Sequence, residues 1–127
     1  TLTKPNWSFR AQRAKESGAF DTGRLAELKR SPLQQIWLDH LLALSMMRAG
    51  DGWECGRFVV LYPELNGRCE AVVANYRTTL VDDATFESWT LEEFHAVVAQ
   101  LTDAEWVSDF YLRYLDFKRL YSPSGDA

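Results

Sequence analysis

RFVVLYP, residues 57–63, predicts the strand around which the chain is organised. Phe58 to Tyr62 is an unbroken run of β-branched, leucine and aromatic residues, bounded by Gly56 and Pro63. A run without polar alternation is typical of a strand buried on both faces, as in parallel sheets that carry helices on each side. Helical patterns precede and follow this run, so the sequence predicts a helix–strand–helix unit.

The two flanking helices have clear start signals and apolar stripes. Ser31-Pro32 marks the first start, because serine caps a helix and proline is tolerated in its first turn. The apolar positions from Leu33 to Met46 then predict a broadly buried helix. Asn66 or Gly67 opens the second helix. Its one-sided stripe at helical spacing is Cys69, Val72, Val73, Tyr76 and Leu80.

A short strand and two further helices complete the pattern. Thr85–Trp89 predicts the strand, and Thr90 with Glu93 has the spacing of a capping box, which Thr102 with Glu105 repeats. The apolar residues of these helices have helical spacing, which predicts core or interface positions and not a base-stacking platform. They are Phe94, Val97, Val98, Leu101, Trp106, Phe110, Tyr114 and Phe117.

Strands that alternate with helices predict an α/β fold with a small, mostly parallel sheet flanked by helices. Asp21–Arg30 predicts a further short helix with Leu25 and Leu28 facing inward. We divide the chain into a basic N-terminal arm, residues 1–30, and an α/β domain, residues 31–127, which the thin sheet suggests is part of a larger domain.

The charge of the chain is uneven. The net charge of −4 argues against a generic nucleic-acid binder, yet residues 1–30 hold seven Lys and Arg against three acids. This arm is either a solvated lead-in or a segment that faces phosphate groups. In the second case the candidate DNA-binding residues are Arg10, Arg13, Lys15 and Arg24.

The two cysteines, Cys55 and Cys69, flank the central strand. The sequence shows no secretory signal and no apolar run near the roughly 20 residues of a membrane span. We therefore expect reduced, partly buried thiols in preference to a disulfide, and a cytoplasmic protein without membrane contact. Two cysteines and two distant histidines are too few ligands for a zinc site.

Motifs of several common enzyme classes are missing from the sequence, including the Gly-rich phosphate loop and the nucleophile elbow. Asp21 with Glu27-Leu28-Lys29 has the residue types of a metal-dependent nuclease motif. The spacing is too short, however, and the pattern there is helical, which favours a surface helix.

Two other places hold candidate site residues. Gln35 and Asp39 lie four residues apart on one helix face, next to Gln34 and His40, and form either a polar seam or a substrate-facing edge. His40 has no acid or nucleophile at a recognisable spacing, which makes it a weak candidate for a general base.

Tyr62 and Asn66 bracket the C-terminal end of the central strand, which in open parallel sheets faces the ligand crevice. Asn66 also fits the simpler role of a helix N-cap.

Several short segments, in order along the chain, carry a resemblance. They are Phe20, Leu33–Ala43, Phe58–Pro63 with Asn66, Tyr76, Phe86 with Thr90–Glu92, and Arg113–Phe117. Together they resemble the C-terminal half of the PD-(D/E)XK group of bacterial restriction endonucleases, over roughly Ser17 to Tyr121.

The resemblance implies a Mg²⁺-dependent DNA endonuclease in which a strand with Glu-x-Lys precedes the helix that begins at Ser31. That helix often bears a glutamine near the metal, a position that corresponds to Gln35 with Gln34 as its neighbour. Residues 1–127 show no aspartate and Glu-x-Lys on predicted strands, so no catalytic or metal-binding residue is assigned in the chain.

We therefore expect a segment of a nuclease-like protein that is inactive alone, with its catalytic strands upstream and DNA meeting the N-terminal arm. The alternative is a non-catalytic interaction or scaffold domain that forms a homodimer. In that case its acidic surface and aromatic C-terminal helices would meet the partner.

Overall fold

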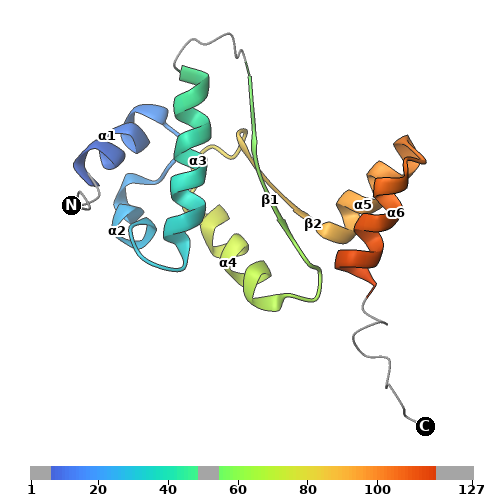
Figure 1. Cartoon of the computed structure of the whole chain (residues 1–127). Coiled ribbons are helices and arrows are strands. Elements are labelled where there is room, and N and C mark those ends of the chain that lie inside the picture. Colours follow the sequence, from blue (N-terminus) through green and yellow to red (C-terminus); the bar gives the residue numbers. More distant parts are fainter. Residues whose placement is uncertain (1–6, 49–54, 117–127) are drawn as a thin grey trace, which may run out of the picture. The chain divides into compact units, whose positions relative to one another are not determined.

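The computed structural model describes residues 7–48 and 55–116, and the sheet in that part of the chain has two parallel strands (Figure 1). The elements are α1 (Trp7–Ser17), η1 (Thr22–Arg24), α2 (Leu25–Leu28), α3 (Leu33–Arg48), β1 (Phe58–Tyr62), α4 (Gly67–Thr78), β2 (Phe86–Thr90), α5 (Leu91–Leu101), α6 (Glu105–Phe110) and the π-helical turn η2 (Tyr111–Leu115). This order confirms the predicted α/β class. None of the helices described is long and apolar enough to cross a membrane.

The chain forms two compact units. The first comprises Thr1–Val60 with Gly67–Ser88, and the second comprises Leu61–Asn66 with Trp89–Ala127. The first unit thus holds α1 to α4 and the beginnings of both strands, and the second holds the ends of the strands together with α5, α6 and η2.

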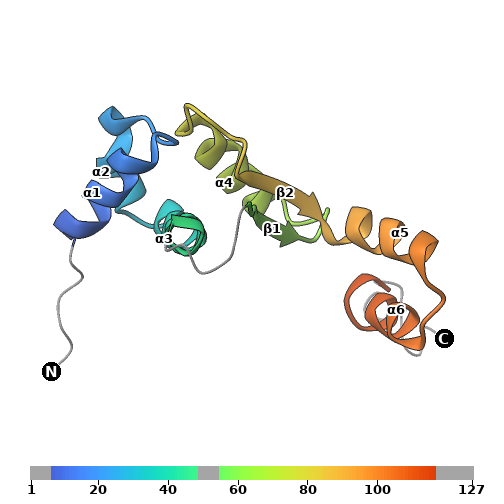
Figure 2. The same ribbon diagram turned by 90° about the horizontal axis from the view of Figure 1, so that it is seen from above.

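In the first unit, α3 is the central helix. Figures 1 and 2 show α1 and α2 on one side of α3 and α4 on the other. α3 starts directly after Pro32, as predicted, and buries Leu33, Trp37, His40 and Leu41. The weak periodicity of the first 20 residues does not predict α1, which packs through buried Ala14 and through Trp7. The Trp7 ring stacks on the Trp37 ring at a centroid distance of 6.2 Å.

The core of this unit surrounds a buried histidine. His40 is fully buried and contacts the rings of Phe20, Phe58, Tyr76 and Phe86, with centroid distances of 5.3 to 6.0 Å. An antiparallel bridge between Phe20 and Leu80 ties the segment after α1 to the segment after α4. The aromatic cluster therefore joins α3, α4 and both strands.

The prediction that β1 is buried on both faces is wrong. Its burial alternates, and Val59 and Leu61 are each 42% exposed, whereas Phe58, Val60 and Tyr62 are half-buried. An uninterrupted apolar run is buried throughout only where helices cover both faces of the sheet. The described residues cover one face, so the other presents apolar side chains to solvent.

The two predicted capping boxes differ. Thr90 forms its box: its hydroxyl accepts from the Glu93 N–H at 3.0 Å, and the Glu93 carboxylate accepts from the Thr90 N–H at 3.1 Å. The prediction of a second capping box is wrong, because the Thr102 hydroxyl accepts a hydrogen bond from the Ala104 N–H, at 3.1 Å, and not from the Glu105 N–H. Ala104 is then the N-cap of α6, without a side-chain hydrogen bond.

The aromatic stripe after residue 105, predicted at core or interface positions, is half-buried at Phe110, whose ring centre lies 5.7 Å from that of Phe94 and 5.1 Å from that of Tyr114. Trp106 is 51% exposed and Tyr114 is 48% exposed, whereas Val107 and Leu115 are buried. The chain changes from α-helix to a π-helical turn at Tyr111, which shifts the direction of the side chains that follow. Phe117, the last position of the stripe, lies outside the described residues.

The prediction for the cysteines holds in part. Cys55 and Cys69 are both thiols and not a disulfide. Cys69 is half-buried as expected, but Cys55 is exposed.

Candidate nucleic-acid interface

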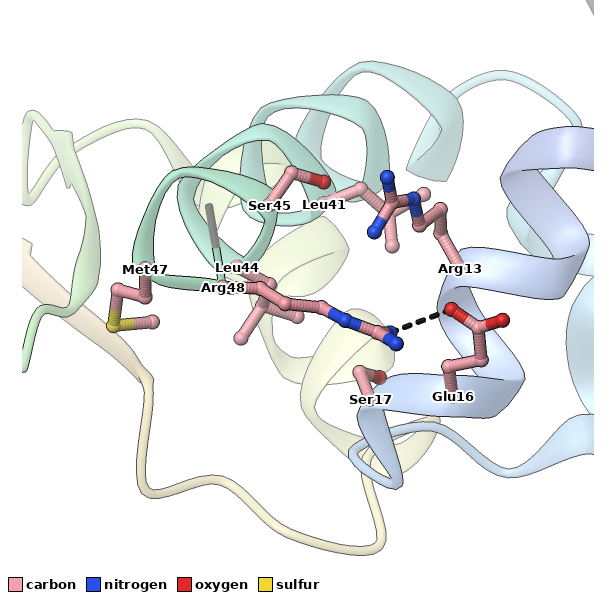
Figure 3. Close-up of a pocket in the computed structure, with 8 residues that line it drawn as sticks. All are labelled: Arg13, Glu16, Ser17, Leu41, Leu44, Ser45, Met47 and Arg48. Carbon is pink, nitrogen blue, oxygen red and sulfur yellow. Dashed lines mark hydrogen bonds and ion pairs between the residues drawn. The ribbon is translucent and has the colours of Figure 1, made fainter. Parts of the chain in front are cut away.

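Two hollows adjoin between α1 and α3. The first has a volume of about 380 Å³ and appears in Figure 3; its lining residues are Arg13, Glu16, Ser17, Leu41, Leu44, Ser45, Met47 and Arg48. The second has a volume of about 360 Å³ and is lined by Phe9, Arg10, Arg13, Leu38, Leu41, Leu42 and Ser45. Because the two hollows share Arg13, Leu41 and Ser45, they form one feature, the α1–α3 groove.

Helix geometry explains which side chains line the groove. Phe9, Arg13 and Glu16 are spaced at i, i+4 and i+7, so they follow one another along the same edge of α1. Ser45 on the opposite wall is small, which leaves space between the helices. Since the Trp7–Trp37 stack holds α1 against α3, the groove is a consequence of how these two helices pack.

One end of the groove is closed by an ion pair. Arg48 Nη1 lies 2.5 Å from Glu16 Oε2, and Figure 3 shows this contact bridging α3 and α1. Gln12 also donates to Glu16, at 3.2 Å. The hydrogen bond from Gln12 and the contact with Arg48 lower the pKa of the Glu16 carboxyl below its usual value. Glu16 therefore neutralises Arg48 at this end.

The other end carries two arginines that contact aromatic rings. The Arg10 guanidinium lies 5.1 Å from the centre of the Trp7 ring, and that of Arg13 lies 5.0 Å from the centre of the Phe9 ring. Neither forms an ion pair with an acid among residues 7–48 and 55–116. Figure 3 shows Arg13 reaching across the groove toward Leu41 and Ser45. Arg13 still acts electrostatically on the Glu16 carboxylate, whose pKa it helps to lower.

Of the four residues predicted to bind DNA, the structure brings Arg10 and Arg13 together. Lys15 is exposed but lines neither hollow, because it is two positions from Arg13 and so points to another side of α1. Arg24 donates to Glu27 at 2.7 Å, to Thr78 at 2.6 Å and to a further residue of α4. Its guanidinium ties α2 to α4, and we do not include it in the groove.

The residues predicted beside an active site are only partly brought together. Gln35 donates to Asp39 at 3.1 Å on the exposed face of α3, and Gln34 is half-buried. Tyr62 ends β1, and Asn66 precedes α4; both belong to the second unit. Gln34, Gln35 and Asp39 therefore lie together on α3, whereas Tyr62 and Asn66 lie at and after the end of β1.

Sequence reasoning missed part of the groove and misjudged one histidine. The spacing of Phe9, Arg13 and Glu16 is a signal that was available, but α1 had not been predicted as a helix. His40 does not belong to the polar edge of α3, because its ring points into the core. Its ring nitrogens lie 2.7 Å from the Tyr76 hydroxyl and 2.8 Å from the Thr85 hydroxyl. Burial lowers the pKa of His40 to about 4 and raises that of Tyr76, so both groups are neutral parts of the core.

The described residues do not fit the divalent metal that the resemblance implies. They contain no group of three or more His, Cys, Asp or Glu able to hold a metal ion. β1 has no acid, and the one acid of β2 is Glu87, which forms an ion pair with Arg57 at 2.8 Å. The residue two positions after Glu87 is Trp89, whereas the Glu-x-Lys motif requires lysine there. Glu27 pairs with Arg24 on a helix, which supports the surface-helix interpretation of that segment.

Comparison with known proteins identifies the family. A family model for the PD-(D/E)XK nuclease superfamily matches residues 7–116, which includes the groove and both strands. No curated protein and no solved structure matches the chain. The resemblance predicted from short sequence segments is thereby confirmed: the chain belongs to the PD-(D/E)XK nuclease superfamily.

Proposed function

We propose that this chain contributes the scaffold and a DNA-phosphate contact of a metal-dependent endonuclease, whose acid and Glu-x-Lys residues come from strands upstream of Thr1. The observation that carries the proposal is the α1–α3 groove, which is lined by Arg10 and Arg13, neither of which forms an ion pair in the described part of the chain. In this proposal Mg²⁺ is held by residues outside those described, and hydrolysis of the phosphodiester takes place there.

The charge distribution supports DNA as the partner. The chain as a whole is acidic, so it repels a polyanion everywhere except where basic side chains gather. Arginine suits this role because its planar guanidinium donates to two phosphate oxygens at once while its face contacts an aromatic ring. Arg10 and Arg13 already have such ring contacts, so binding a phosphate requires little reordering.

The double replacement Arg10→Gln and Arg13→Gln is expected to weaken DNA binding about tenfold or more at low salt. It should also reduce the slope of log affinity against log salt by about two, since two phosphate contacts are lost. Fluorescence anisotropy with a labelled oligonucleotide measures both quantities.

Lys15→Gln is the matched control, because it removes one positive charge from the same helix on another side. Its effect should be clearly smaller. Equal losses in both variants would contradict a localised site, and no binding at low salt would contradict the proposal.

The chain with Mg²⁺ or Mn²⁺ is expected to leave DNA uncut, because no metal-binding cluster lies in the described residues. A form extended upstream by strands that carry an acid and Glu-x-Lys should cut it. Agarose gels of plasmid DNA after incubation with each metal test both statements. An extended form that is inert with both ions would contradict the nuclease proposal.

A scaffold that dimerises is the second candidate, and one observation favours it. The second unit exposes large apolar side chains, which are typical of surfaces that meet a partner. They include Leu101 (78%), Trp106 (51%), Leu112 (47%) and Tyr111 (43%). Absence of DNA binding together with a stable dimer in sedimentation would favour this candidate over the first.

A further inference from the structure

We propose that an acidic surface of the second unit docks on the basic α1–α3 groove of a second copy of the chain. Two different surfaces, one of each charge, then hold the two copies together. The inference goes beyond the proposed function, because it names these two surfaces and stands whether or not the groove also binds DNA.

The second unit is strongly acidic. Its described residues, 61–66 and 89–116, hold seven acids and a single arginine, Arg113. The acids are Glu64, Glu92, Glu93, Asp103, Glu105, Asp109 and Asp116. None of them forms an ion pair within the described residues. A surface with charges of one sign attracts a surface of the opposite sign and repels one like itself.

Two acids of α6 stand next to large exposed apolar side chains. Glu105 and Asp109 are four positions apart, so they lie on one side of the helix, where their like charges repel each other. Trp106 follows Glu105 and is 51% exposed, and Leu101 at the end of α5 is 78% exposed. Exposed apolar anchors beside charged groups are typical of protein–protein interfaces. We call Leu101, Glu105, Trp106 and Asp109 the acidic face.

The α1–α3 groove has the complementary character. Its lining includes three arginines, Arg10, Arg13 and Arg48, but a single acid, Glu16. Figure 3 shows Arg13 extending into the groove from α1 and Arg48 extending from α3. Leu42 on the α3 wall is 61% exposed, so the groove also offers an apolar contact. It therefore supplies the positive charge and the apolar surface that the acidic face lacks a partner for.

Two chains can form this contact reciprocally, because each carries one acidic face and one groove. An arrangement in which the two acidic faces meet each other is disfavoured, since their charges repel. Attraction between opposite charges at a protein surface is screened by salt. The chain should therefore self-associate at low salt and separate into monomers at high salt.

Sedimentation velocity of the full chain, over a series of protein concentrations at low salt, tests the contact by reversing charges. Glu105→Arg with Asp109→Arg should weaken self-association about tenfold or more, because like charges then face each other. Arg10→Glu with Arg13→Glu should weaken it to a similar extent. An equimolar mixture of the two double variants should restore association, since each then offers the charge that the other requires.

Glu70→Arg with Asp83→Arg is the matched control: it makes the same charge change at two exposed positions of the first unit and should alter self-association by no more than about twofold. A wild-type chain that stays monomeric at low salt would contradict the inference, as would a mixture of the reversed variants that stays monomeric. DNA binding by such a monomer would leave the proposed function in place. Self-association as expected without any DNA binding would contradict the proposed function alone.

Discussion

Acidification from about pH 7.5 to about pH 4 is expected to lower the free energy of unfolding by about 3 kcal/mol through His40 alone. The pKa of His40 is about 4 in the folded chain, against an ordinary value of 6.5. Because the folded pKa is depressed, the unfolded state binds the proton first. The loss of stability therefore begins as the pH falls through 6.5 and is complete below 4.

The surroundings of His40 explain the depressed pKa. The ring is fully buried among aromatic side chains, and its nitrogens meet the hydroxyls of Tyr76 and Thr85, not a carboxylate. Burial disfavours the charged imidazolium, and no acid contacts the ring among the described residues to offset that cost. In the neutral ring one nitrogen donates and the other accepts, which suits two hydroxyl partners.

Denaturant unfolding at a series of pH values measures this effect. About 2 kcal/mol should already be lost at about pH 5, above the range in which most carboxyl groups titrate. His40→Gln keeps a donor and an acceptor but cannot titrate, so it should be less stable at neutral pH and should lack this part of the pH dependence. An identical pH dependence in the wild type and in His40→Gln would contradict this account of His40.

Elements with strong local signals were predictable from the sequence. An apolar run predicted β1, a Ser-Pro start predicted α3, and a one-sided apolar stripe predicted α4. The capping box at Thr90 was also predicted correctly, because the two residues that form it are only three positions apart. Thr102 shows the limit of such signals: the same spacing occurs there, but its hydroxyl bonds an N–H before the helix starts.

The groove was not predictable in the same way, because it depends on tertiary packing. α1 has a weak pattern of its own and is held by Trp7 against Trp37, a residue 30 positions further along the chain. Which faces of α1 and α3 meet then decides that Arg10 and Arg13 line a hollow while Lys15 does not. Similarly, the exposure of Val59 depends on which elements cover β1, and no local pattern contains that information.

Trp37→Ala is expected to destabilise the first unit by about 3 to 5 kcal/mol, the range for removing a large aromatic side chain from a core. Trp37 is fully buried, and the substitution also removes the ring on which Trp7 stacks. Trp106→Ala is the matched control: it removes the same side chain from a position that is 51% exposed, and its cost should be well below that of Trp37→Ala. Denaturant unfolding monitored by circular dichroism compares the two.

Trp37→Phe separates the two contributions of this residue. Within the described residues the buried Trp37 Nε1 has no hydrogen-bond partner, and such a group costs about 1 to 3 kcal/mol relative to one in water. Phenylalanine keeps a ring for the Trp7 stack and removes the unpaired donor, which partly offsets the smaller volume of its side chain. Trp37→Phe should therefore lower the free energy of unfolding by less than half as much as Trp37→Ala. Since the stack holds α1 in place, Trp37→Ala should also weaken DNA binding, whereas Trp37→Phe should not. Unchanged DNA affinity in a folded Trp37→Ala variant would contradict the dependence of the groove on this stack.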